Sequence, residues 1–255
     1  MIVDVLRHGS SADLAEAAAA RVVTTLVEVL SQRDEAHLCL TGGGIGTAVL
    51  AAVRQCADAV DWSRVHLWWG DERFLPAGDP ERNETGALAA LIDHIRIPAD
   101  HVHPMPTPEQ AHADVDEAAA LYAEELARHA LPHSDPPVPV MDILLLGIGP
   151  DGHVASLFPE QPAVHDQRTT AGVHGSPKPP PLRVTLTFPT IRASEQVWVL
   201  ASGEEKARAV ALALMPEAGE FQVPAAGARG RRRTLFLLDE AAASHLPVDL
   251  GRPSA

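Results

Sequence analysis

The segment with the strongest catalytic potential spans residues 147–156 and combines three glycines with an acid and a histidine. A histidine has an unperturbed pKa of about 6.5, so at neutral pH its ring is mostly the free base. His153 could therefore activate a water molecule as a general base, while Asp151 could orient or polarise the ring. The competing interpretation is that Asp151 caps a helix and that His153 only completes a structural hydrogen bond.

Ser156 ends the same segment but does not lie in the G-x-S-x-G turn that exposes the nucleophile of many hydrolases. We therefore expect no covalent catalysis at this serine. Its hydroxyl is instead expected to bond to the backbone in the first turn of a helix.

A second glycine-rich segment begins at Thr41 and continues through Gly42, Gly43 and Gly44. Consecutive glycines let backbone N–H groups approach a phosphate, and a following helix N-terminus favours an anion. The segment is not a Walker A motif because it has no lysine, and Thr47 breaks the G-x-G-x-x-G pattern. Phosphate binding and a tight strand-to-helix turn without a ligand are equally supported interpretations.

Charged residues follow a third apolar run, at Asp71, Glu72 and Arg73. The planar guanidinium of Arg73 can clamp a phosphate or a carboxylate. Asp71 or Glu72 could hold sugar hydroxyl groups. An ordinary solvated loop with a local ion pair explains the same residues equally simply.

Three further cations lie near later strands. Lys178 and Arg183 bracket a run of prolines, and Lys206 lies at an expected helix start. A cation at a helix N-terminus opposes the helix dipole unless an anionic ligand compensates. Solvent exposure is the alternative interpretation for all three.

Histidines elsewhere in the sequence are expected to bind no metal. His101, His103 and His112 could suggest a metal site, but Pro104 follows His103 and no nearby carboxylate is placed to complete the site. We therefore predict that none of these histidines is a metal ligand.

The elements that must position these residues alternate between short apolar strands and helical patterns. Strands are predicted at 37–40, 65–69, 143–146, 183–188, 197–200 and 234–238. Helices are predicted at 12–30, 46–55, 87–92 and 108–128, and a further helix carries Lys206. This alternation predicts one α/β domain over residues 1–255, with a mostly parallel sheet and helices on both faces. Ligands of such sheets bind outside the carboxyl ends of the strands, where the glycine and charged segments fall.

The composition favours a globular chain that acts on small molecules. The 255 residues are 46% hydrophobic, which supports a sizeable core. The net charge of −14 disfavours non-specific binding to nucleic acid or to an anionic membrane, so the basic run at 229–233 is expected to be a solvated loop. Cys39 and Cys56 form no zinc or C-x-x-C pattern. With neither a signal peptide nor a membrane-spanning stretch recognisable, we expect a cytoplasmic protein with no membrane partner.

Together these segments resemble the 6-phosphogluconolactonase family. Residues 147–159 are similar to its signature, and 69–73 resemble a second motif. Further similarities occur, in the family's order, at 41–43, at 177–187, and at Gly203 with Lys206. One departure follows the Asp-Glu-Arg motif, where the family commonly has a Ser-Asn-Tyr-like segment. Here residues 82–84 read Arg-Asn-Glu, so only Asn83 matches.

The resemblance implies a Rossmann-like, doubly wound sheet and hydrolysis of 6-phospho-D-glucono-1,5-lactone to 6-phosphogluconate. It implies neither a metal nor an organic cofactor. It gives His153 the role of general base, with Asp151 beside it. The substrate- and phosphate-binding candidates are then Thr41, Gly42, Gly43, Asp71, Arg73, Arg183 and Lys206.

Two other functions remain open alternatives. A glucosamine-6-phosphate deaminase or isomerase on the same scaffold would open a sugar ring with a histidine, and would need extra acidic groups to move a proton between C1 and C2. A non-catalytic sugar-phosphate sensor usually carries a helix-turn-helix, for which Gly42 falls too early in the sequence. We expect a monomer or weak dimer whose partner is a small sugar-phosphate lactone.

Overall fold

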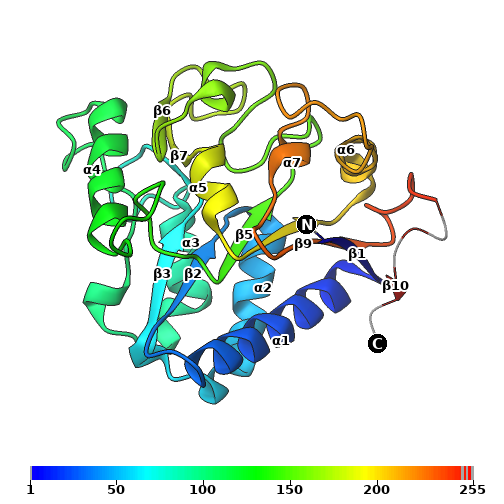
Figure 1. Cartoon of the computed structure of the whole chain (residues 1–255), viewed down its shortest axis with the longest axis horizontal. Coiled ribbons are helices and arrows are strands. Elements are labelled where there is room, and N and C mark those ends of the chain that lie inside the picture. Colours follow the sequence, from blue (N-terminus) through cyan, green and yellow to red (C-terminus); the bar gives the residue numbers. More distant parts are fainter. Residues whose placement is uncertain (1, 248–249, 251, 254–255) are drawn as a thin grey trace.

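A seven-stranded sheet forms the centre of the computed structural model, which describes residues 2–247, 250 and 252–253 (Figure 1). Its strand order is β10-β1-β9-β8-β5-β2-β3, and every neighbouring pair is parallel. The strands are β1 (Ile2–His8), β2 (Ala36–Leu40), β3 (Val65–Trp69), β5 (Ile143–Gly147), β8 (Gln196–Ala201), β9 (Arg233–Asp239) and β10 (Arg252–Pro253). The predicted mostly parallel α/β architecture is confirmed, although β1 has no counterpart among the predicted strands.

Three short strands form a second, antiparallel sheet in the order β4-β7-β6. They are β4 (Asp71–Arg73), β6 (Thr170–Val173) and β7 (Arg183–Leu186). The alternating pattern at 183–188 predicts a strand correctly up to Leu186, but Phe188 and the following Pro189 begin a helix instead. Because Arg73 pairs with Arg183 in this sheet, the charged segment and the proline-rich segment lie side by side.

Helices cover the central sheet. In the view of Figure 1, α1 and α2 run below the sheet, α5 and α7 lie above it, and α4 lies at its left. The described helices are α1 (Ser11–Leu30), α2 (Gly43–Gln55), α3 (Asn83–Ala90), α4 (Val115–Arg128), α5 (Phe188–Ala193), α6 (Ala207–Ala213) and α7 (Pro224–Gly227). None of these helices is both long and apolar enough to cross a membrane.

The predicted helix at 108–128 begins only at Val115. His112 and Ala113 adopt left-handed backbone conformations, with φ of 47° and 60°, and so interrupt any helix that started earlier. The Asp114 carboxylate then accepts two backbone N–H groups of the first turn of α4. By contrast, α2 and α3 begin three and four residues before their predicted starts.

The sheet has a switch point between β2 and β5. From β2 the next strand along the chain, β3, lies on one side, whereas β5, β8 and β9 follow on the other. In open α/β sheets a crevice forms at the carboxyl ends of the strands at such a point. The segments after β2 and β5 meet there, and the Gly147 backbone N–H donates a 3.2 Å hydrogen bond to Thr41 Oγ1.

Candidate active site

A cleft of about 550 Å³ lies at this switch point, where Thr41, Gly147 and Ala201 mark the ends of three strands. It brings together nearly all of the predicted site residues. Those that line it are Thr41, Gly42, Gly43, Asp71, Arg73, His153, Arg183 and Lys206. Asp151 does not line the cleft but contacts His153, which does.

His153 and Asp151 form a close pair on the segment after β5. The His153 Nδ1 atom lies 2.5 Å from Asp151 Oδ1. Both side chains fold over Gly149, where a Cβ atom would lie 2.0 Å from His153 Nδ1. Gly152 between them has a φ of +86°, which an L side chain rarely adopts. The glycines of this segment therefore let the acid and the imidazole meet within two residues.

Lys178 adds a positive charge beside this pair. Its Nζ lies 3.4 Å from His153 Nδ1 and 3.8 Å from Asp151 Oδ1. Burial alone would raise the pKa of Asp151, but the hydrogen bond with His153 and the charges of His153 and Lys178 lower that pKa to about 2. Asp151 is thus a carboxylate at neutral pH, and its short contact favours the tautomer with the proton on Nδ1 and the lone pair on Nε2.

The first glycine segment forms the N-terminus of α2 at the other side of the cleft. Gly42 precedes the helix and supplies no side-chain cap, so the first N–H groups are left for another acceptor. A Cβ atom on Gly42 would lie 1.8 Å from Asn83 Oδ1, and Gly43 has a φ of +79°. The pattern of glycines is therefore fixed by the close approach of Asn83 and by the sharp turn into the helix.

Ser156 does not bond to the backbone in a helix, contrary to the expectation from the sequence. It lies in a turn, is fully buried, and donates a 2.6 Å hydrogen bond from Oγ to Asp71 Oδ2. Asp71 is also held by Asn83, whose Nδ2 donates to the Asp71 backbone oxygen at 2.8 Å. Asp71 therefore ties the segment after β5 to β4, and both of its carboxylate oxygens have protein donors, since Asn83 Nδ2 also lies 3.4 Å from Oδ1.

Glu72 points away from the cleft and supports α3. Its carboxylate accepts the backbone N–H groups of Asn83 and Glu84, at 2.7 and 2.8 Å. These are the first two residues of the helix, so Glu72 acts as a buried cap. Of the two acids considered for binding hydroxyl groups, Asp71 lines the cleft and Glu72 does not.

Four cations line the cleft, and two of them also shape it. Arg183 is buried and donates to the backbone oxygens of Lys178 and Pro179, which holds the proline-rich segment in place. Arg73 donates from Nη1 to the Glu81 backbone oxygen, while its buried Nε has no partner within the described part of the chain. The Lys206 ammonium lies 3.8 Å from Glu205.

Lys178 and Asn83 contribute more to the cleft than their positions in the sequence indicate. Solvent exposure is the alternative interpretation for Lys178, and its side chain is indeed partly exposed, but it also lines the cleft and lies against His153. Asn83 matched the family pattern only in isolation, yet it contacts both Asp71 and the neighbourhood of Gly42. For Asn83, the match to the family pattern was a signal in the sequence that could have identified it. Ser11 and Ser202 also line the cleft, but no sequence pattern indicates them.

Comparison with known proteins agrees with this geometry. Residues 9–237 match the family described as glucosamine-6-phosphate isomerases/6-phosphogluconolactonase. A 6-phosphogluconolactonase from Streptomyces coelicolor is 55% identical over 97% of this chain and 96% of its own length. One from Mycobacterium tuberculosis is 47% identical, over 92% and 94% of the two chains. The structure of the Trypanosoma brucei 6-phosphogluconolactonase superposes with a TM-score of 0.82 at 27% identity, over 96% of this chain and 99% of that one. The chain therefore belongs to the glucosamine-6-phosphate isomerase/6-phosphogluconolactonase family.

Proposed function

We propose that this chain hydrolyses 6-phospho-D-glucono-1,5-lactone to 6-phospho-D-gluconate. The observation that carries the proposal is the placement of the His153–Asp151 pair in one cleft with an uncapped helix N-terminus and several cations. A lactone with a phosphate at its far end needs both features, a base near C1 and an anion site some distance away. The high identity to curated lactonases supports the same reaction.

The phosphate is assigned to the Gly42–Gly43–Gly44 turn at the N-terminus of α2, together with Arg73 and Lys206. Backbone N–H groups and the helix dipole favour an anion there. The guanidinium of Arg73, which lines the cleft, and the partly exposed ammonium of Lys206 can add charge-assisted hydrogen bonds. Arg183 contributes positive charge and holds the proline-rich segment.

Hydrolysis then proceeds by general base catalysis. Nε2 of His153 takes a proton from water as the water oxygen bonds to C1, which gives a tetrahedral oxyanion. Lys178, which lines the cleft beside the His153 ring, is the cation assigned to stabilise that negative charge. The C1–O bond to the ring oxygen then breaks, and His153 returns its proton to that oxygen. Asp151 stabilises the imidazolium that exists between the two proton transfers.

We further propose that the chain acts in the cytoplasm as a monomer or weak dimer, on a small substrate and without nucleic-acid or membrane partners. The large exposed apolar side chains come from scattered segments, as monomeric proteins commonly show. They are Val3, Val27, Leu131, Met215, Phe221 and Leu250.

The direct test is the initial rate of lactone opening with and without the protein. The lactone is generated in situ, and 6-phosphogluconate is followed through a coupled dehydrogenase against a blank, since the lactone also opens unaided. We expect a rate well above the blank. A rate equal to the blank, with ammonia released from glucosamine 6-phosphate in a parallel assay, would instead identify a deaminase.

A further inference from the structure

A cluster of imidazole rings lies outside the cleft, beside the edge strand β3. The ring centroids of His66 and His101 are 3.9 Å apart, and those of His66 and His129 are 5.1 Å apart. None of the clustered rings belongs to a residue that lines the cleft. The cluster contains His37, His66, His101, His103 and His129.

Three of these rings converge with the spacing of metal ligands. His66, His103 and His129 each offer a ring nitrogen, and the three nitrogens all lie within 4.8 Å of one another. The closest pair, His66 Nδ1 and His103 Nε2, is 2.9 Å apart. Two nitrogens bound tetrahedrally to one zinc ion, at bond lengths of about 2.0–2.1 Å, lie roughly 3.3 Å apart. Small ring shifts therefore suffice to enclose an ion.

One carboxylate, that of Glu125, lies behind two of the converging rings. Glu125 Oε1 lies 2.8 Å from His103 Nδ1 and 3.6 Å from His129 Nε2. The Nδ1–H group of His103 thus donates to Glu125, and its Nε2 lone pair faces the cluster. Metal-binding histidines usually donate their second N–H to a carboxylate in this way.

The proton positions also favour a cation. With the proton of His103 on Nδ1, the proton in the 2.9 Å contact belongs to His66 Nδ1. His66 Nε2 is then buried with no hydrogen-bond partner among the described residues. If a metal replaces the shared proton, the His66 proton moves to Nε2, which faces Glu35 Oε2 at 3.8 Å. Metal binding at Nδ1 would therefore place the His66 proton on Nε2, towards a carboxylate just beyond hydrogen-bond distance, without net proton release.

We propose that His66, His103 and His129 form a binding site for a divalent transition-metal ion such as zinc. Neutral imidazole nitrogens suit zinc, copper and nickel, whereas calcium and magnesium prefer oxygen ligands. The ion would cross-link β3, the segment before Pro104 and the end of α4, outside the cleft to which the lactone is assigned.

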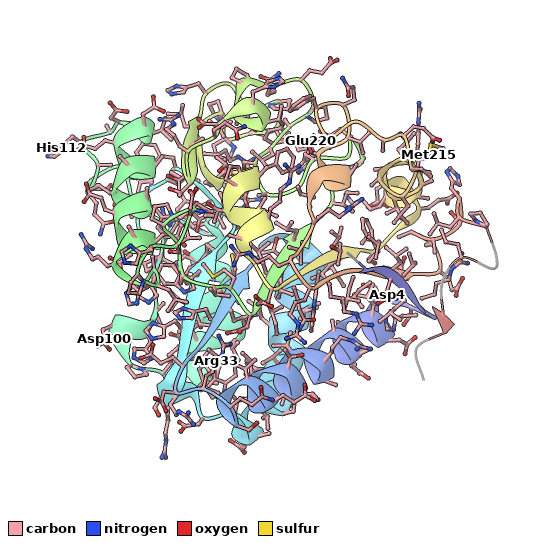
Figure 2. All side chains as sticks on the ribbon, in the orientation of Figure 1. Asp4, Arg33, Asp100, His112, Met215 and Glu220 are labelled. Carbon is pink, nitrogen blue, oxygen red and sulfur yellow. The ribbon has the colours of Figure 1, made fainter. Side chains whose placement is uncertain are left out.

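The sequence predicts no metal site because no carboxylate was seen near His101 and His103. The fold supplies that carboxylate from Glu125 on α4. His112, the third histidine considered, lies at the periphery of the molecule and pairs with Glu117 instead (Figure 2).

The test is titration of the chelator-treated protein with zinc chloride by calorimetry, and with cobalt chloride by absorption spectroscopy. Three variants are compared: His129→Gln, whose side chain is partly exposed, Glu125→Gln, and His174→Gln as a control. His174 is an exposed histidine that pairs with Asp116 outside the cluster. Lactone hydrolysis, expected to be unchanged in all three, verifies folding.

We expect one zinc ion per chain and a tetrahedral cobalt spectrum. Affinity should fall at least about 10-fold in Glu125→Gln, by analogy with other carboxylates behind metal ligands, and further in His129→Gln. The control should bind as the unmodified protein does. Absence of saturable zinc binding, or equal affinity in His129→Gln and the unmodified protein, would overturn the proposal.

Discussion

The Nδ1 atom of His153 lies 2.5 Å from the carboxylate oxygen Oδ1 of Asp151, two residues earlier in the same glycine-rich segment. This contact gives the imidazole one defined tautomer, with its lone pair on Nε2. The same carboxylate is held ionised by a pKa of about 2, so the contact persists across the pH range in which a histidine can act as a base.

Removing the charge of Asp151 should slow catalysis while leaving the fold intact. In Asp151→Asn the imidazolium loses its stabilising charge and the ring loses its fixed tautomer. By analogy with triads that lose this acid, kcat should fall about 10²-fold or more. Steady-state kinetics should show this, with Asp166→Asn as a control, because Asp166 pairs with Arg168 outside the cleft. An unchanged kcat in Asp151→Asn would mean that the acid does not assist His153.

Ser156→Ala should affect stability more than chemistry. The Ser156 hydroxyl is fully buried and donates to Asp71, and a lost hydrogen bond to a charged group costs about 1.5–3 kcal/mol. Urea denaturation should show a loss in the free energy of unfolding within that range. The turnover should stay within about 10-fold of the unmodified protein, because no covalent step uses the hydroxyl. A loss as large as 10⁴-fold would indicate a nucleophile.

Lys206→Met should weaken the binding of phosphorylated substrate only. A lost charge-assisted hydrogen bond of about 1.5–3 kcal/mol corresponds to roughly a 10–100-fold rise in KM for the phosphorylated lactone. Kinetics with glucono-1,5-lactone, which lacks the phosphate, should be the same before and after the substitution. Arg208→Met is the matched control, because Arg208 is exposed on α6 and does not line the cleft. Equal losses on both lactones would contradict a phosphate contact.

The histidine cluster should make the fold sensitive to acid. Burial and neighbouring histidines lower the pKa of His37 to about 3, and burial lowers that of His103 to about 4. Both rings therefore bind protons more readily in the unfolded chain. Their contribution to stability is complete above pH 6.5 and declines as the pH falls from 6.5 towards 4. For His103 alone the loss is on the order of 3 kcal/mol.

Denaturation measured from pH 7.5 to 4.5 in the presence of a chelator tests this expectation. His103→Gln should be less stable at neutral pH but should show a shallower dependence on pH. A stability that does not change between pH 6.5 and 4.5 would show that the cluster is not buried as described.

The central sheet and the convergence of the cleft could be predicted from the sequence for a simple reason. Parallel strands end at one edge of a sheet, so glycine and charged segments that follow apolar runs meet there. This placed the segments after β2 and β5 together although Thr41 and Gly147 are 106 residues apart. Asp151 and His153 are two residues apart in the sequence, so their contact could also be predicted.

Contacts that depend on how separate elements pack could not be predicted. The hydrogen bond from Ser156 to Asp71 spans 85 residues and involves the small antiparallel sheet, of which the sequence pattern predicts only the strand β7. The grouping of His66, His103 and His129 likewise depends on α4 packing near the edge strand. The start of α4 at Val115 could not be predicted, because His112 and Ala113 adopt left-handed backbone conformations that their residue types do not indicate.

The substitution His153→Asn tests the role of His153 as the general base most directly. The measurement is kcat and KM for in-situ generated lactone, corrected for unaided opening, with product binding measured in parallel by calorimetry. We expect kcat to fall about 10²-fold or more, while KM and the affinity for 6-phosphogluconate change only a few-fold. A kcat close to that of the unmodified protein would contradict His153 as the general base and move the catalytic role to another residue of the cleft.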